Sequence, residues 1–486
     1  MFTLKPLIYA AITSILLSTP STLALENNRN KLPEIGAAGF SVLSIDKERI
    51  IGQAMMRQIR AAEPLVNDPV LIEYINDLGN QLVKNAHDVN YSFEFFLINN
   101  KELNAFAFFG GHVGIHTGLI TLADTESELA SAIAHEISHV TQRHLARRLE
   151  SQSQTQALSM AGVVSGILLT LVNPTIGMAA LNASIAATQQ ASINYTRSNE
   201  KEADRVGITL LANSQFNPQA AANFFGKMAE KYRYKSTPPP MLLTHPVPES
   251  RITDARQRAF AFTPRILPPK LNFELAKARI TARYEHNSQH NIQYFQRLLE
   301  RQTYILKPAA EYGLALSYLE NKQYHQAQEI LESLYQQDNK NLFYVDTLSD
   351  IYIAQKTFDK AIDMLDELNL LMPYNQVVTL NYANVLQSAK YYEKASDLLQ
   401  DFLVTQPDNF IAYDLLTDIY RKQNKMALMH SSKAEILALM GAYNRAIDEL
   451  HTGYNFADDT PLIRQRIKAR ISQFQALENK QKNLKL

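Results

Sequence analysis

The stretch Thr125-Glu-Ser-Glu-Leu-Ala-Ser-Ala-Ile-Ala-His-Glu-Ile-Ser-His139 sets the expected fold of the first half of the chain. A threonine followed three residues later by Glu128 is a capping box, in which the two side chains satisfy backbone N–H groups that the first helical turn leaves unpaired. We therefore expect a helix to begin here. Residues four apart lie on one face of a helix, so His135 and His139 point the same way.

Two imidazoles on one helix face, with Glu136 beside them, are typical of a zinc site in a metallopeptidase. Zinc would lower the pKa of a water molecule, and Glu136 would accept its proton and pass it to the leaving amine. The alternative is an ordinary polar helix without a metal. The pattern lies in the middle of a helix that we expect to reach about Arg148, and this position favours the zinc site.

The segment Asn104–Leu119, just before that helix, predicts two short strands. Gly110-Gly111 between them is typical of a hairpin turn. An extended peptide can add to the edge of such a hairpin through its backbone, which would favour unfolded chains as substrates. The candidate substrate-binding residues at this edge are Asn104, Ala105 and Phe106.

A catalytic zinc site needs a third protein ligand. Metzincin spacing would place it at Leu145, which cannot bind a metal, and the adjacent His144 falls on another helix face, so we treat His144 as an ordinary polar residue. Residues 151–196 carry no charge. Of the carboxylates that follow, Glu200 and Asp204 share a helix face. One can bind zinc while the other hydrogen-bonds a ligand histidine; a solvated charged helix is the alternative.

Together, His135-Glu136-x-x-His139 and Glu200-x-x-Ala-Asp204 resemble the zinc endopeptidase family that contains the CAAX-prenyl endopeptidases and the heat-shock membrane protease HtpX. The resemblance implies that Glu200 is the third zinc ligand and that Asp204 supports the catalytic site. The family also carries an Asn-Ala-Phe-Ala segment and a Gly-Gly pair before its zinc helix, as this chain does. Many members have a proline directly before the glycines, where this chain has Phe109.

The resemblance also singles out His245, in Thr244-His-Pro-Val-Pro-Glu249. The resemblance implies that, as in periplasmic members of this family, this histidine can occupy the open coordination position of the zinc and hold the enzyme inactive. Pro246 keeps His245 in an extended or turn segment, from which a histidine can reach a metal, although a lone loop histidine usually has no such role. Arg251, a few residues further, is expected to face the substrate.

Composition excludes several other kinds of site. Lys and Arg together number 48, as do Asp and Glu, and the chain has no cysteine. The lack of cysteine excludes disulfides, thiolate metal sites and cysteine nucleophiles. The charge balance gives no general attraction to nucleic acid or to anionic membranes, so no nucleic-acid partner is expected.

The N-terminus predicts export. Lys5 precedes a short apolar run that ends near Thr22-Leu-Ala24, the small-x-small pattern of a cleaved signal peptide. We expect residues 1–24 to be removed, because the run is shorter than the roughly 20 residues that a spanning helix needs. An uncleaved inner-membrane anchor is the alternative.

The mature chain is expected to divide at a proline-containing linker, residues 263–270, into a zinc metalloprotease domain (25–262) and a repeat domain (271–486). Similar residues recur every 34 positions in the second part, which is typical of tetratricopeptide repeats. The columns are Tyr284, Tyr318 and Tyr352; Ala327, Ala361 and Ala395; and Tyr324, Phe358 and Tyr392.

The period slips after Tyr420, since Tyr443 lies 51 residues beyond Tyr392. We therefore expect irregular last units that act as a cap. A second irregular feature is the apolar segment 157–191, which Asn173-Pro174 interrupts before it is long enough to span a membrane. This segment is predicted to cover the catalytic core; peripheral contact with a membrane surface or a partner is the alternative.

The predicted fold is α+β and mostly helical: a zincin-type metalloprotease domain with a small β-hairpin or sheet, followed by an α-solenoid of tetratricopeptide repeats. The predicted function is a periplasmic endopeptidase with one zinc per chain. The resemblance implies misassembled or misfolded outer-membrane β-barrel proteins as substrates, and the β-barrel assembly machinery as a partner that the repeats bind. A chaperone or adaptor scaffold with a silent, latched zinc site is the rival hypothesis.

Overall fold

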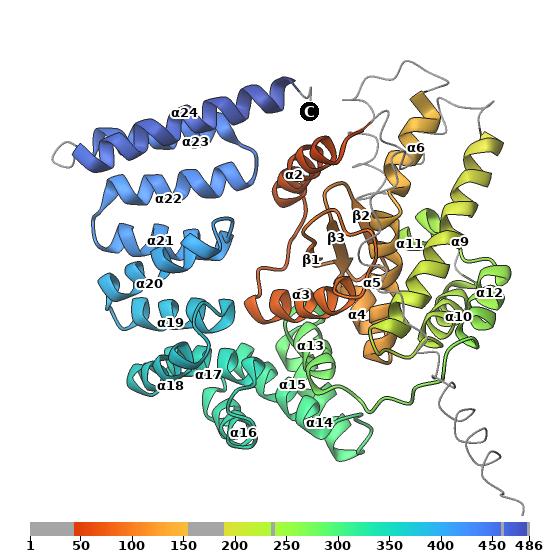
Figure 1. Ribbon diagram of the computed structural model, residues 1–486. Helices are drawn as coiled ribbons and strands as arrows, with labels where there is room; N and C mark the ends of the chain where they lie inside the picture. The colour runs from red at the N-terminus through yellow and green to blue at the C-terminus, as the bar shows by residue number, and fades with distance from the viewer. Residues whose placement is uncertain (1–42, 154–188, 235–238, 458–460, 484–486) are drawn as a thin grey trace, which may run out of the picture.

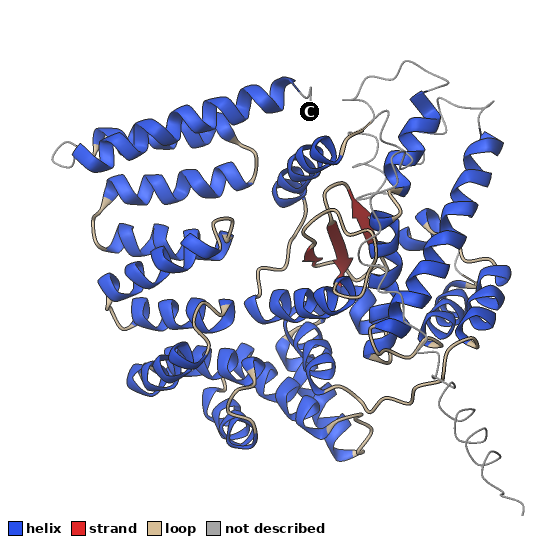
Figure 2. Cartoon of the chain, in the orientation of Figure 1, coloured by secondary structure: helices blue, strands red, loops and turns tan. Residues whose placement is uncertain are grey.

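The computed structural model describes residues 43–153, 189–234, 239–457 and 461–483. Helices make up most of this part of the chain, around one small sheet (Figure 2). No helix among these residues combines the length and the apolar character needed to cross a membrane. The predicted signal peptide and most of the charge-free segment lie outside the described residues.

The sheet has three strands, β1 (Glu94–Ile98), β2 (Ala105–Phe108) and β3 (His112–His116), in the order β1-β3-β2. The predicted hairpin is present: β2 and β3 pair antiparallel, and Gly110 and Gly111 turn the chain with φ values of 82° and 85°. These positive φ values favour glycine. The second strand ends at His116, earlier than predicted, and the sequence analysis missed β1, which pairs parallel with β3.

Gly114, in the central strand, fixes how the phenylalanines pack on one face of the sheet. Its register partners on the two sides are Phe96 and Phe106. A Cβ atom built at Gly114 would lie 2.7 Å from the ring of Phe106 and 2.8 Å from that of Phe96. Only glycine leaves room for both rings, which meet edge to face at a centroid distance of 6.0 Å.

Helices cover both faces of the sheet (Figure 1). On one face, residues such as Phe95 and Val113 join a large core with α3 (Pro69–Val83) and α5 (Glu126–Thr141). On the other, the phenylalanine face packs against α2 (Ile45–Ala62).

Thr125 caps α5, since its hydroxyl accepts a hydrogen bond from the backbone N–H of Glu128 at 3.2 Å. The predicted capping box is only half formed, because the Glu128 carboxylate accepts from the N–H of Asp124, at 2.8 Å, rather than from that of Thr125. The predicted continuation to Arg148 is wrong, because α5 ends at Thr141. Arg143 adopts a left-handed conformation, with φ 52°, and a separate helix, α6 (His144–Ser153), follows. The buried Arg143 side chain donates to Glu48 of α2 at 3.0 Å and to the carbonyl of Leu43 at 2.7 Å.

Helix α9 (Gln189–Asn213) lies alongside α5, and a glycine allows the close approach. A Cβ at Gly207 would lie 3.3 Å from the backbone of Ala134 and His135. The other helices among the described residues of this half are α4 (Thr117–Leu122), α10 (Ala220–Tyr232), α11 (Pro240–Thr244) and α12 (Glu249–Ala259). Residues 263–270, the predicted linker, contain neither helix nor strand.

The second half is an arc of helix pairs, which confirms the repeat prediction (Figure 1). Ala327, Ala361 and Ala395 are fully buried near the start of the second helix of successive pairs. The shift of 51 residues is one and a half periods, so Tyr443 begins the third helix after the one that Tyr392 begins, whereas one full period leads to the second. In order, the elements are α13 (Leu271–Ile280), the π-helix η2 (Thr281–Glu285), α14 (Ser288–Glu300), α15 (Lys307–Glu320), α16 (Tyr324–Gln337), α17 (Leu342–Gln355), α18 (Phe358–Leu371), α19 (Gln376–Ser388), α20 (Tyr392–Thr405), α21 (Phe410–Lys422), α22 (Met426–Leu439), α23 (Tyr443–Asn455) and α24 (Pro461–Asn483).

Candidate metal centre

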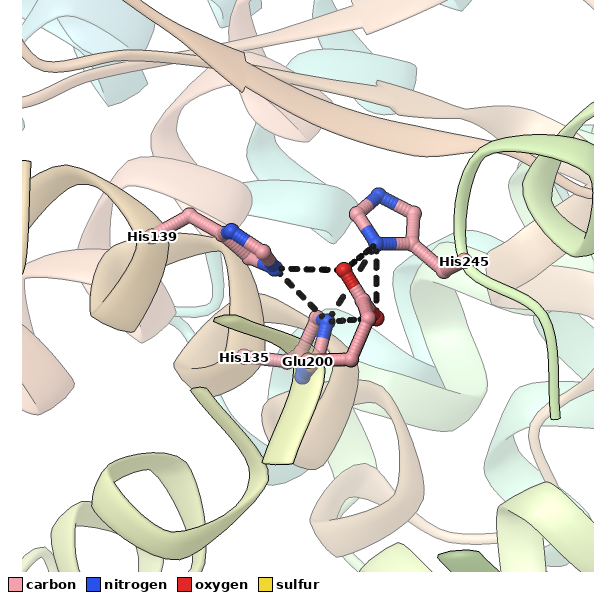
Figure 3. Close-up of side chains that lie close together, drawn as sticks. All are labelled: His135, His139, Glu200 and His245. Carbon is pink, nitrogen blue, oxygen red and sulfur yellow. Dashed lines mark hydrogen bonds and ion pairs between the residues drawn. The ribbon is translucent and has the colours of Figure 1, made fainter. Parts of the chain in front are cut away.

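The two histidines of α5 meet at one point. Nε2 of His135 and Nε2 of His139 lie 3.0 Å apart, which follows from their spacing of one helical turn. Glu200, from the neighbouring helix α9, closes the third side. Its two carboxylate oxygens lie 3.3 Å from the Nε2 atoms of His135 and His139, one oxygen to each (Figure 3).

His245 approaches from the opposite side, directly after the short helix α11. Its Nδ1 atom lies 3.4 Å from Nε2 of His135 and 3.0 Å from Glu200 (Figure 3). Its Nε2 atom lies 3.5 Å from Glu136 Oε1. The backbone holds the segment in place, because the N–H of Met241 donates to the carbonyl of Leu103, just before β2, at 3.1 Å.

These four residues fit a metal ion. One donor atom from each of His135, His139, Glu200 and His245 lies within 4.8 Å of all the others. Imidazole nitrogens with a carboxylate oxygen are a donor set that zinc accepts. Glu136 Oε1 is buried and has no hydrogen-bond partner, so a polar group brought by a ligand would satisfy it.

Asp204 contacts the ring of His135 on the side away from the centre. Its carboxylate lies 3.1 Å from Nδ1 of His135, on the side of the ring away from the other three ligand candidates. Among the four ligand candidates, Asp204 contacts only His135, and it does so at the ring nitrogen that faces away from the centre. We therefore describe it as a positioning residue for His135.

Arg251, which the sequence analysis expected to face the substrate, lies behind the centre. Its side chain is 4% exposed and makes two hydrogen bonds to Asp204, both of 2.8 Å. It also lies 3.0 Å from Glu200, and its guanidinium carbon sits 5.0 Å from the ring centroid of Phe225. Arg251 therefore neutralises the carboxylates behind the centre, a long-range pairing that the sequence does not signal.

The interpretation of His144 as an ordinary polar residue is wrong. His144 is buried, and its Nδ1 atom lies 2.9 Å from Nδ1 of His139. Its Nε2 atom lies 3.2 Å from Glu202. A continuous helix would have placed it on another face, whereas the left-handed Arg143 reorients the chain so that His144 meets His139.

Burial and neighbouring charges shift the pKa values of the groups at the centre in different directions. Burial lowers the pKa of His139 to about 3, which leaves the ring neutral, as a metal ligand must be. Burial acts in the same direction on His135, but Asp204 and Glu200 outweigh it and raise the pKa of His135 to about 10. Burial would raise the pKa of Glu200, yet the surrounding histidines outweigh it and hold that pKa well below its ordinary value. This cluster of charged carboxylates is suited to a divalent cation in place of a proton.

The predicted substrate edge lies at a sheet border. Strand β2 ends the order β1-β3-β2, so one of its sides faces away from the sheet. The side chains of Ala105 and Phe106 are buried, and the carbonyl of Asn104 accepts a hydrogen bond from His116 N–H at 3.0 Å. A peptide added to this edge would therefore meet backbone rather than side chains.

Comparison with known proteins agrees with these observations. The sequence model of peptidase family M48 matches residues 71–259, and that of anaphase-promoting complex (cyclosome) subunit 3 matches residues 286–368 of the repeats. Among solved structures, yeast Tom70 covers 72% of this chain and 82% of its own, at 13% identity and a TM-score of 0.27, a likeness too weak to carry an argument.

Three curated relatives match over nearly the full chain. A putative beta-barrel assembly-enhancing protease of Vibrio cholerae is 42% identical, over 92% of this chain and 93% of its own. Beta-barrel assembly-enhancing proteases of Yersinia pestis and Escherichia coli are each 39% identical, the first over 98% of this chain and 99% of its own, the second over 94% of both. With this identity, the M48 match and the histidine–glutamate centre, the chain belongs to the family of beta-barrel assembly-enhancing proteases, which are M48 metalloproteases.

Proposed function

We propose that this protein is a periplasmic zinc endopeptidase that degrades misassembled outer-membrane β-barrel proteins. The observation that carries the proposal is the convergence of His135, His139 and Glu200 next to the buried Oε1 of Glu136, which has no hydrogen-bond partner. The first three residues would hold one zinc ion. When bound, zinc supplies the Lewis acidity that polarises a peptide carbonyl and lowers the pKa of water.

The residues around the metal would have separate roles in the reaction. Glu136 accepts a proton from the attacking water and delivers it to the leaving amine. Asp204 holds the His135 ring in orientation, and Arg251 balances the negative charge of Asp204 and Glu200. The edge of β2 would hold the substrate as an added strand, with Asn104, Ala105 and Phe106 presenting their backbone.

His245 would keep the centre closed. It points one ring nitrogen at the ligand cluster and the other at Glu136, so it occupies the place that water and substrate need. An enzyme held this way binds clients through its repeats while cleavage is off. The rival, a chaperone or adaptor scaffold, corresponds to a chain in which this latch never opens.

The name of the relatives supports the choice of client, since they are called beta-barrel assembly-enhancing proteases. The repeats offer a concave surface that suits a protein partner. We propose the β-barrel assembly machinery as that partner, and export through a signal peptide removed after Ala24. Mass spectrometry of the mature protein tests the last point, because an inner-membrane anchor would leave the N-terminus uncleaved.

The decisive experiment measures zinc content and casein cleavage in the full mature chain. We expect about one zinc per chain, cleavage lost in Glu136→Gln with zinc retained, and cleavage raised in His245→Ala. His290→Ala, an exposed histidine on α14, is the matched control and should behave as the parent. Absence of zinc, or cleavage that survives Glu136→Gln, contradicts the peptidase assignment. Bound zinc with no cleavage in either the parent or His245→Ala favours the scaffold.

A further inference from the structure

We propose that His144 is a positioning residue that fixes the orientation and tautomer of His139, with Glu202 as its outer anchor. The inference deepens the proposed function and rests on it, since His139 matters in this way only as a metal ligand. It concerns neither the ligands themselves nor the His245 latch.

The evidence is a continuous chain of close contacts leading away from the centre. Nδ1 of His139 lies 2.9 Å from Nδ1 of His144, and Nε2 of His144 lies 3.2 Å from an oxygen of Glu202. The same oxygen lies 2.9 Å from Arg147. His144 is 4% exposed, so water has little access to compete for its ring nitrogens.

Only one arrangement of protons satisfies this chain. Nε2 of His139 faces the other ligands, so Nδ1 of that ring must carry the proton. It then donates to Nδ1 of His144, which must be unprotonated, and His144 in turn donates from Nε2 to Glu202. Each ring nitrogen thus has one fixed role, and His139 presents its lone pair to the metal.

The contact between His139 and His144 depends on a break in the helix at Arg143. In an unbroken helix, His144 would be rotated about 140° from His139 around the helix axis. The left-handed backbone of Arg143 breaks the helix between them, and the hydrogen bonds from Arg143 to Glu48 and to the Leu43 carbonyl hold the break. A buried arginine in a conformation that non-glycine residues seldom adopt indicates a specific local requirement.

The two ligand histidines are consequently supported in different ways at their outer ring nitrogens. Nδ1 of His135 meets the carboxylate of Asp204 directly at 3.1 Å, whereas Nδ1 of His139 reaches a carboxylate only through His144. Partners that orient metal-binding histidines in this manner typically change metal affinity by about 10- to 100-fold when removed. We expect the same range for loss of His144.

The test is the rate at which the full mature chain releases zinc to an excess of a coloured chelator. His144→Leu removes the acceptor while keeping much of the volume, and should release zinc about 10- to 100-fold faster. His144→Asn places an amide oxygen near the position of Nδ1 and should restore slow release. Glu202→Ala should accelerate release less, because Glu202 is partly exposed and water can replace it.

Controls separate packing from hydrogen bonding. His116→Leu removes another buried histidine, whose ring contacts the carbonyl of Glu102, and should lower thermal stability without changing zinc release. If His144→Leu does not fold, the His144→Asn and Glu202→Ala variants still give the comparison. Zinc release unchanged in His144→Leu, or equally fast in His144→Leu and His144→Asn, overturns the inference but leaves the peptidase intact. A parent chain that binds no zinc refutes the proposed function itself.

Discussion

At the scale of single residues, the neighbours of a buried histidine decide its charge. His116 and His135 are both nearly inaccessible, at 2% and 4% exposure. His135 has two carboxylates beside it, and they raise its pKa. His116 has only a backbone carbonyl, and burial lowers its pKa to about 4. His135 therefore carries a positive charge that the two carboxylates balance, whereas His116 is a neutral part of the sheet.

This difference predicts a pH effect on stability. The pKa of His116 is lower in the folded chain than the ordinary 6.5, so the unfolded chain binds more protons between pH 6.5 and about 4. Stability therefore falls as the pH decreases through that window, by about 2 kcal/mol between pH 7.5 and pH 5 from this group alone. His116→Asn keeps a donor for Glu102 and cannot titrate. The difference in unfolding free energy between parent and variant should shrink or reverse on acidification, and a difference that does not depend on pH would contradict the assignment.

The sequence predicted those site residues that depend on local spacing. His135 and His139, or Glu200 and Asp204, lie one helical turn apart, and that geometry is independent of the rest of the fold. The contacts of His144 and Arg251 could not be predicted, because their places depend on distant partners. Glu48 holds the left-handed Arg143 from 95 positions away, and Arg251 pairs with Asp204 across 47 positions. Glu200 follows the histidine motif only after a charge-free stretch of 46 residues, 151–196. Local spacing therefore could not connect the two, and Glu200 and Asp204 were reached by excluding other carboxylates.

At the scale of elements, small side chains set the spacing of the repeat helices. Ala361 is fully buried in α18, as its equivalents are in α16 and α20. Ala361→Leu should therefore force the pair apart and destabilise the chain by about 1–3 kcal/mol in chemical unfolding followed by circular dichroism. Ala354→Leu makes the same change at an exposed position of α17 and serves as the control. Equal stability of the two variants would show that this column does not determine the packing.

Elements with complete local signals were predicted, and those defined by pairing were not. The hairpin had its two glycines and helix α5 its capping threonine, and both elements start as predicted. Strand β1 pairs parallel with β3 while β2, which lies between them in sequence, pairs on the other side. No local pattern specifies such a crossing. The end of α5 was likewise missed, because a buried ion pair at Arg143 overrides the helical preference of the following residues.

At the scale of the whole molecule, helix α3 joins the two halves. One side of it packs on the sheet, where Gly79 leaves room for the ring of Phe95. The other side faces the repeats, where Asn375 donates to Glu73 at 2.6 Å. A single apolar core runs from the sheet through α3 into the first repeats, although the linker between them has no secondary structure. At the far end of the arc, Arg57 of α2 lies 5.9 Å from the ring centroid of Tyr443.

A buried ion network fixes this junction. Arg279 of α13 is 0% exposed and donates to Asp68, the N-cap of α3, at 2.7 Å and to Asp346 of α17 at 2.5 Å. Tyr312 accepts a further hydrogen bond from Arg279 at 2.8 Å. Burial would raise the pKa of Asp68, but the guanidinium groups of Arg279 and Arg283 outweigh it and hold that pKa below its ordinary value. The charged network therefore connects the peptidase half to three helices of the second half, α13, α15 and α17.

Because both aspartates would remain buried without their partner, Arg279→Met should cost about 3–5 kcal/mol of unfolding free energy. The loss should appear in both halves together, since they share one core. We expect helix content, measured by circular dichroism, and zinc retention to be lost at the same, lower denaturant concentration. Asp254→Asn, which breaks a partly exposed pair with Arg258 on one helix, should change stability by less than about 1 kcal/mol. If zinc retention in Arg279→Met instead follows the parent while helix content is lost early, the junction does not couple the peptidase half to the repeats. In that case a structural change in the repeats would not reach the metal centre through Asp68.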